Sequence, residues 1–245
     1  MAYSGFQIRH LSFHGSEKKP ATASFQSGLN VVYGASDTGK SYIVEAIDFM
    51  LGGKGPLPDI PQAKGYDRVL LAIAFDDGSE TTLLRSITGG QFQAFEGLHT
   101  SIPDVEGSRL DEIHNERDES NLSSFLLSKI GLAGKRIRKN AKDETQALSF
   151  RNLARLAIVN EEEIIQKRSP LSDGNYTANT AKPSDRHELY AITPAFDRGI
   201  AKPINEQVNV MNCPHFRPDS RHKQKGSSTG LRTGLCLTHI DTLNC

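Results

Sequence analysis

The residues of this chain with the clearest chemical capacity lie in one stretch, GASDTGKS, from Gly34 to Ser41. Its spacing fits G-x-x-x-x-G-K-[ST], in which a glycine-containing loop points successive backbone N–H groups into one concavity. Lys40 would reach the β- and γ-phosphates of a nucleoside triphosphate, and the Ser41 hydroxyl would ligate Mg²⁺. The alternative is a Gly/Ser turn without a ligand. We expect Mg²⁺ and ATP to bind at Gly34, Ala35, Ser36, Asp37, Thr38, Gly39, Lys40 and Ser41.

The segments on either side of this stretch supply the context that the motif requires. Leu29 to Tyr33 is a short, mostly apolar run that predicts a buried strand leading directly into glycine. After Ser41 the apolar residues change to helical spacing, and Gly52-Gly53 supplies the stop. The expected apolar face of this helix consists of Ile43, Val44, Ile47, Met50 and Leu51.

The rest of the first two thirds of the chain predicts paired strands followed by helices. Runs beginning at Phe6 and Ala21 predict two paired strands ahead of the loop. Three later β-rich runs, separated by the turn signals DDGS and TGG, predict an antiparallel meander at Arg68 to Phe75, Thr81 to Ile87 and Gln91 to Phe95. One helix capped by Ser120 and a second at Ser149 to Val159 are expected, with a charged loop between them.

Beyond Pro170 the character of the sequence changes, because repeated prolines interrupt every candidate element. We expect an α/β P-loop fold with an antiparallel β subdomain in residues 1–175. Residues 176–245 are expected to form a low-order tail. A shifted reading frame near Ser184 would explain the change in composition. The α/β P-loop fold would then be incomplete and followed by a disordered C-terminal tail.

Composition narrows the possible partners and the compartment. Lys plus Arg equals Asp plus Glu, 29 against 29, so no global field attracts nucleic acid or a membrane. No signal peptide or membrane span is recognisable, and the 3 cysteines lie near the C-terminal end, so we expect a cytoplasmic protein without a disulfide framework. A basic run at 135–142 could meet DNA phosphates or form a solvated loop. Four potential zinc ligands, Cys213, His215, Cys236 and His239, lack a regular spacing.

The segment FQSGLNVVYGASDTGKSYIVEAIDFMLGG resembles the head of the SMC, RecN and SbcC-type AAA ATPases, which are relatives of the ABC transporter ATPases. The strand pair before the loop, the meander after it and the later segment NEEEIIQKRSP, Asn160 to Pro170, occur in the order that this family uses. The resemblance covers about residues 6 to 175.

The resemblance implies an ATPase that acts in DNA repair or chromosome maintenance. In that family a glutamine in the later segment touches Mg²⁺ and the attacking water, and the matching position here is Gln166. The alternative for Gln166 is a solvated loop. The acidic run Glu161 to Glu163 is read as a solvated face and receives no role. Implied partners are DNA and a second head or the C-terminal half of an SMC-like ATPase.

The sequence leaves the catalytic activity open. Hydrolysis in the resembled family needs a carboxylate on a second apolar strand and a serine-glycine signature, and neither follows residue 170. The run Val69 to Asp77 is similar to such a strand, but the turn signal after it favours a hairpin. A hydrolysing ATPase, a non-hydrolysing nucleotide-binding remnant that regulates a partner, and a small P-loop kinase therefore stand as alternatives. The strands ahead of the loop argue against the kinase.

Overall fold

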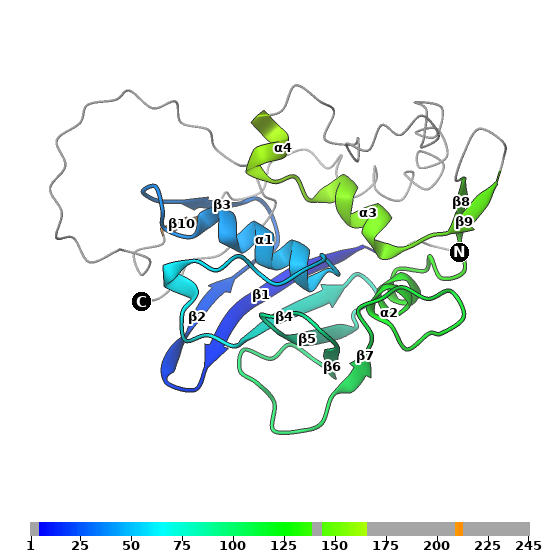
Figure 1. Cartoon of the computed structure of the whole chain (residues 1–245), viewed down its shortest axis with the longest axis horizontal. Helices are drawn as coiled ribbons and strands as arrows, with labels where there is room; N and C mark the ends of the chain where they lie inside the picture. Colours follow the sequence, from blue (N-terminus) through cyan, green and yellow to red (C-terminus); the bar gives the residue numbers. More distant parts are fainter. Residues whose placement is uncertain (1–4, 139–143, 166–208, 213–245) are drawn as a thin grey trace, which may run out of the picture.

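The computed structural model describes residues 5–138, 144–165 and 209–212 (Figure 1). Its largest element is a 6-stranded sheet with the order β2-β1-β4-β5-β6-β7, in which every neighbouring pair is antiparallel. The strands are β1 (Phe6–Gly15), β2 (Lys18–Ser24), β4 (Arg68–Phe75), β5 (Glu80–Ser86), β6 (Phe92–Glu96) and β7 (Ser108–Leu110). The predicted strand pair, meander and α/β architecture with an antiparallel β subdomain are confirmed.

Strand β4 lies in the interior of the sheet and is buried on both faces. Val69, Leu71 and Ile73 belong to the main core, whereas Leu70 belongs to a smaller cluster on the other face, as the two-residue period of a strand requires. At the end of β4, Asp77 Oδ1 accepts a hydrogen bond from the Ser79 amide at 2.8 Å, which closes the turn into β5. The run Val69 to Asp77 therefore forms a hairpin, as the turn signal predicted.

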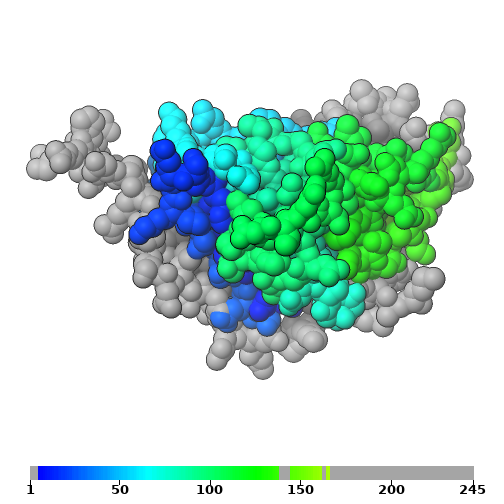
Figure 2. All heavy atoms as spheres, turned by 90° about the horizontal axis from the view of Figure 1, so that it is seen from below, coloured from blue at the N-terminus to red at the C-terminus, as the bar shows by residue number. Residues whose placement is uncertain are grey.

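Helix α1 (Lys40–Met50) lies along one face of the sheet and supplies much of the main core (Figure 1). Its predicted apolar face is confirmed, and Met50 is completely buried. Gly52 then adopts a positive φ of 91°, which a residue with a side chain rarely adopts, and the helix ends there. On the opposite face, Phe95 and Ile102 pack with the smaller cluster, and the green part of the chain near residue 100 crosses this side of the molecule (Figure 2).

Three further helices follow the sheet: α2 (Leu122–Lys129), α3 (Phe150–Ala157) and α4 (Glu161–Ile165). The predicted cap of α2 at Ser120 is wrong by one residue, because Asn121 Oδ1 accepts the Ser124 amide at 2.9 Å. Asn121 takes this position because its side chain also donates to the backbone of the preceding loop. The α3 prediction is confirmed, with Ser149 at its N-cap.

Two small sheets complete the described structure and correct two predictions. The expected charged loop between α2 and α3 contains two antiparallel paired strands, β8 (Arg136–Arg138) and β9 (Thr145–Ala147), and Arg136 Nε also donates to Thr145 Oγ1 across the pair. Strand β3 (Asn30–Tyr33) pairs in parallel with β10 (Asn209–Asn212), which lies within the expected tail. For these four residues the expectation of a low-order tail is wrong, because the backbone of β3 provides hydrogen-bonding partners.

The other predictions for the C-terminal part cannot be compared with this structure. The four potential zinc ligands and Lys139 and Lys142 of the basic run lie outside the described residues. Within the described ranges, no helix is long and apolar enough to span a bilayer.

Candidate functional site

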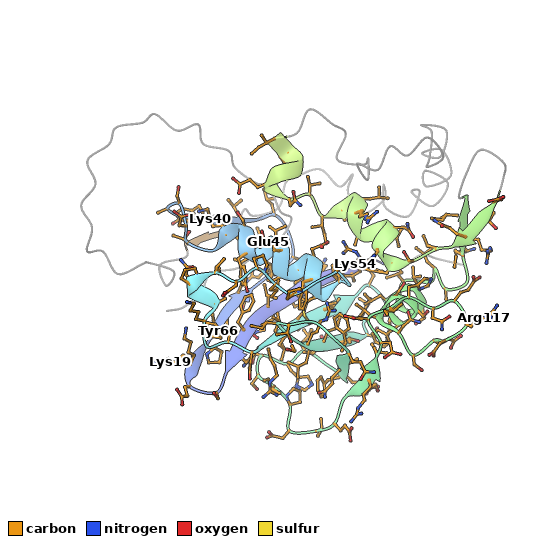
Figure 3. All side chains as sticks on the ribbon, in the orientation of Figure 1. Lys19, Lys40, Glu45, Lys54, Tyr66 and Arg117 are labelled. Atoms are coloured by element: carbon orange, nitrogen blue, oxygen red, sulfur yellow. The ribbon has the colours of Figure 1, made fainter. Side chains whose placement is uncertain are left out.

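The GASDTGKS segment connects the end of β3 to the start of α1, so strand, loop and helix follow in the predicted order. Strand β3 is less buried than predicted: Asn30 is fully buried, but Tyr33 is 48% exposed. The reason is that β3 pairs only with β10 among the described strands and is not an interior strand of the large sheet. Figure 3 shows Lys40 at the N-terminal end of α1, and the loop before it is mostly exposed.

The loop is held in shape by hydrogen bonds to the carbonyl oxygen of Ala35. The buried Thr38 hydroxyl donates to this oxygen at 2.8 Å, and Lys40 Nζ donates to it at 2.5 Å. Lys40 Nζ also donates to Thr38 Oγ1 at 3.2 Å. The ammonium group is therefore folded onto its own loop, where it would exchange carbonyl and hydroxyl acceptors for the stronger acceptors of an anionic ligand.

The backbone of the loop explains why glycine and small polar residues occupy it. Gly39 has a φ of 83° immediately before α1, and Asp37 has a φ of 60°, a conformation that aspartate tolerates better than most residues. A Cβ atom at Gly34 would lie 3.2 Å from Thr38 Oγ1, so a larger residue would crowd this contact. The loop therefore needs its glycines for shape, in agreement with the motif.

The N-terminus of α1 lacks a side-chain cap among the described residues. No acidic residue lies in its first turn. The first N–H groups of a helix lack intrahelical acceptors, and the helix dipole places partial positive charge at this end. These features together with Lys40 form a site suited to phosphate oxygens, because helix N-termini bind such anions through their backbone.

Asn30 organises the entry to this site, although the sequence suggested only a strand residue. Its side-chain amide donates to the carbonyl oxygens of Gln26 and Gly28 at 3.1 Å each, and its Oδ1 accepts the Gln26 amide at 3.3 Å. These contacts fix the turn that leads from β2 into β3. The available signal was a polar residue inside an otherwise apolar run, since a buried amide must find several hydrogen-bond partners.

The Ser41 hydroxyl has a partner that is remote in sequence. Ser41 Oγ donates to Glu161 Oε2 at 2.9 Å, which joins the first turn of α1 to the start of α4. Glu161 received no role in the sequence interpretation, whereas Gln166 did, and Gln166 lies outside the described residues. The sequence could not select Glu161, because it is one of three consecutive glutamates and only the fold shows which of them faces α1.

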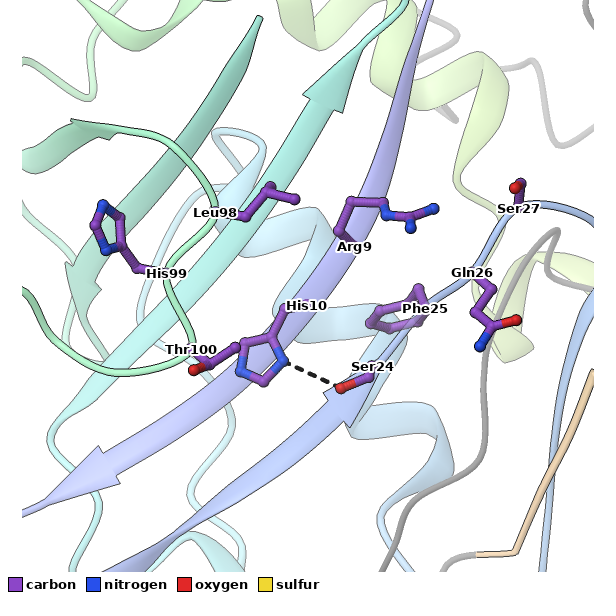
Figure 4. A pocket seen from close by; sticks show the side chains of 9 residues that line it. All are labelled: Arg9, His10, Ser24, Phe25, Gln26, Ser27, Leu98, His99 and Thr100. Atoms are coloured by element: carbon purple, nitrogen blue, oxygen red, sulfur yellow. Dashed lines mark hydrogen bonds between the residues drawn. The ribbon is translucent and has the colours of Figure 1, made fainter. Parts of the chain in front are cut away.

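A separate hollow of about 390 Å³ lies between β1, the end of β2 and the loop after β6 (Figure 4). His10 lies in it and contacts Ser24 Oγ through Nδ1 at 3.3 Å. Burial lowers the pKa of His10, and the charge of His14 lowers it further. No residue of the Gly34 to Ser41 loop lines this hollow, whose lining is Arg9, His10, Ser24, Phe25, Gln26, Ser27, Leu98, His99 and Thr100.

Comparison with known proteins places the loop in a wider context. A family model described as an AAA domain matches residues 11–190, which includes the loop, α1 and α4. No curated protein matches the chain. Among solved structures, one similar chain is the Smc head domain with an extended coiled coil, bound to the C-terminal domain of ScpA, from Pyrococcus furiosus. The identity is 22% and the TM-score 0.29; the match covers 39% of this chain and only 31% of that one.

Proposed function

The chain belongs to the AAA domain family, and from this premise we propose that it binds Mg-ATP through Gly34 to Ser41. Family membership confirms the resemblance to AAA ATPases seen in the sequence, together with a P-loop type of fold. The observation that carries the proposal is the N-terminus of α1, which no side chain of the described residues caps, next to an ammonium group that donates to its own loop. Such an end offers backbone donors and one mobile cation to a triphosphate.

Binding would replace contacts that the loop now makes with itself. The Lys40 ammonium would leave the carbonyl oxygen of Ala35 and turn toward the β- and γ-phosphates, where a charge-assisted hydrogen bond is stronger. Thr38 would keep its bond to Ala35 and so preserve the loop conformation. The Ser41 hydroxyl oxygen would ligate Mg²⁺, which neutralises phosphate charge when bound.

The biological role that we propose is that of an ATPase acting in DNA repair or chromosome maintenance, with DNA and a second head or a C-terminal half as partners. Support comes from the family and from the order of elements around the loop. The rival is a nucleotide-binding module that does not hydrolyse ATP but regulates a partner. It is favoured by the β4–β5 hairpin, because this apolar run ends in a turn and not at the nucleotide site.

The binding proposal is tested by calorimetry with Mg-ATP on the parent chain and the Lys40→Ala variant. We expect the variant to bind at least about tenfold more weakly, because a hydrogen bond to a charged group contributes about 1.5–3 kcal/mol. Lys54→Ala is the matched control, since Lys54 is exposed beyond the other end of α1 (Figure 3). Equal affinity of the Lys40 variant and the parent would refute the site.

Hydrolysis is tested by phosphate release from the purified chain, with Lys40→Ala as the control for contaminating ATPases. We expect almost no turnover, because absence of a catalytic base typically reduces the rate by about 10²–10⁴-fold. Adding the C-terminal half of a related SMC-type head should raise turnover if the chain acts as part of an ATPase. No change on addition would favour the regulatory module. Robust turnover by the chain alone would show that it already contains the missing carboxylate.

A further inference from the structure

The contact between Ser41 and Glu161 adds a carboxylate to the proposed cation site. The hydroxyl of Ser41 donates to Glu161 Oε2 at 2.9 Å, and the side chains of both residues are exposed. We propose that Glu161 is an anionic ligand of the Mg²⁺ that accompanies nucleotide at Ser41. This inference rests on the proposed function, and it adds Glu161 to the metal-binding role that the family resemblance assigned to Gln166.

The oxygen atoms of Ser41 and Glu161 are of the kind that Mg²⁺ binds. Mg²⁺ prefers hard oxygen ligands in octahedral geometry at about 2.0–2.1 Å, so neighbouring ligand oxygens lie about 2.9 Å apart. Ser41 Oγ and Glu161 Oε2 already stand at 2.9 Å, joined by the hydroxyl proton. A cation between them would require that proton to turn away, but it would not require the two oxygens to separate. Among the described residues no cluster of three or more acidic, His or Cys side chains offers a competing metal site.

A second contact, between α1 and α3, ties the segment before Glu161 to the same helix. Arg151 of α3 forms a two-pronged ion pair with Asp48 of α1, with distances of 2.8 and 3.1 Å. Arg151 also donates to the backbone carbonyl oxygen of Asp48 at 3.3 Å. Both side chains are only partly exposed, at 29% and 34%, and a bidentate pair of this kind fixes orientation as well as distance.

The two contacts define how the α3–α4 segment lies. Ser41 and Asp48 are about two turns apart on α1 and therefore face the same side. Arg151 meets the C-terminal half of α1, and Glu161 meets its first turn, so α3 and α4 run back along the helix (Figure 1). Arg151 is thus a positioning residue for Glu161, acting through the path of the chain between them.

The alternative is that Glu161 only locks the Ser41 hydroxyl while the site is empty. The two roles predict opposite changes in Mg-ATP affinity when the Glu161 carboxylate is removed. A carboxylate that ligates Mg²⁺ strengthens Mg-ATP binding, but without the cation it repels the triphosphate. A lock competes with Mg²⁺ for the hydroxyl, so its removal would strengthen Mg-ATP binding.

The experiment measures ATP binding by calorimetry in excess Mg²⁺ and again in EDTA for the parent, Glu161→Gln and Glu161→Asp. Gln keeps the shape and removes the charge; Asp keeps the charge on a shorter stem. We expect Glu161→Gln to weaken Mg-ATP binding by about tenfold or more, since even outer-shell partners of metals matter by about 10–100-fold. Binding in EDTA should be unchanged or stronger. Glu161→Asp should keep part of the increase in ATP affinity that Mg²⁺ produces in the parent.

The matched control is Glu96→Gln, which makes the same charge change at the exposed end of β6 and should alter neither measurement. As a second readout, which reports on the cation directly, paramagnetic resonance of Mn²⁺ with ATP should show a larger free Mn²⁺ fraction in Glu161→Gln. Arg151→Ala should cause a smaller loss that disappears in the Glu161→Gln background, because it acts through that residue.

Two results overturn the inference, and they differ from failure of the proposed function. If Glu161→Gln binds Mg-ATP as tightly as the parent, Glu161 is not a ligand. If it binds more tightly, Glu161 is a lock on the empty site. If the parent itself binds no nucleotide with or without Mg²⁺, the proposed function has failed as well.

Discussion

The two ends of helix α1 are built in opposite ways. At its C-terminal end the buried guanidinium group of Arg85 donates to the carbonyl oxygens of Phe49 and Gly53 at 3.0 and 3.3 Å. The same group lies between the rings of Phe49 and Phe92, and it also pairs with Glu112. At the N-terminal end no side chain caps the helix, and Ser41 is exposed.

This difference follows the charges that a helix presents at its ends. The last carbonyl groups carry partial negative charge and are satisfied here by a cation of the protein. The first N–H groups carry partial positive charge, and no side chain of the described residues caps them. One end of α1 is therefore completed by the fold, while the other is the proposed binding site. Stability and binding should be separable along this helix.

The largest effect on stability is expected at the completed end, from Arg85→Met. The substitution keeps an apolar side chain between the two rings but removes every donor of Arg85, and Glu112 loses its cationic partner while the Gly90 amide still donates to it. We expect the free energy of unfolding to fall by about 2–4 kcal/mol, less than for a fully buried pair because Glu112 is 44% exposed.

Urea unfolding measures this change. Arg109→Met is the matched control, because Arg109 forms an exposed pair with Glu106 and should contribute less than about 0.5 kcal/mol. A loss below about 1 kcal/mol for Arg85→Met would mean that the completed end adds little to the fold.

At the open end, Lys40→Ala should leave stability nearly unchanged without nucleotide, within about 0.5 kcal/mol. With Mg-ATP at 100 times the parent's Kd the parent should gain about 2.7 kcal/mol, and a variant that binds about tenfold more weakly should gain about 1.4 kcal/mol. Unfolding curves with and without Mg-ATP separate the stability of the empty protein from the stabilisation that bound nucleotide adds. If Lys40→Ala destabilised the empty protein as strongly as Arg85→Met, the contrast between the two ends would be lost.

The smallest effect concerns the sheet beneath the helix. Burial lowers the pKa of His10 and of His14 from the ordinary value of 6.5, so these histidines are protonated at lower pH in the folded protein than in the unfolded chain. Their contribution is present above pH 6.5 and is lost as the pH falls below it, with a slope of at most about 1.4 kcal/mol per pH unit for each histidine.

Urea unfolding between pH 5 and 8 should show this slope, and His10→Gln and His14→Gln should each reduce it. The increase in the free energy of unfolding caused by Mg-ATP depends on the N-terminal end of α1. Above pH 6.5 this increase should therefore be the same in both histidine variants as in the parent. An unchanged slope in both variants would assign the pH dependence to other groups.

Much of the fold was predictable because local patterns and tertiary contacts agree. The two-residue alternation, the turn signals and the helical spacing after Ser41 each describe surfaces that the core then buries. The cap of α2 was displaced by one residue because Ser120 and Asn121 both suit a cap, and contacts with the preceding loop decided between them. Pairing of β3 with β10 was not predictable, because the two strands are distant in the chain.

By itself, the sequence determined the proposed phosphate-binding loop, since the glycine positions, Lys40 and Ser41 are set by spacing along a continuous segment. Only the tertiary structure decided which residues serve that loop from elsewhere. Asp48 and Arg151 lie 103 positions apart, and Ser41 and Glu161 lie 120 apart. A sequence pattern records neighbours along the chain, whereas the contact between Ser41 and Glu161 depends on distance in space. For this reason Glu161 emerged from the fold and not from the motif.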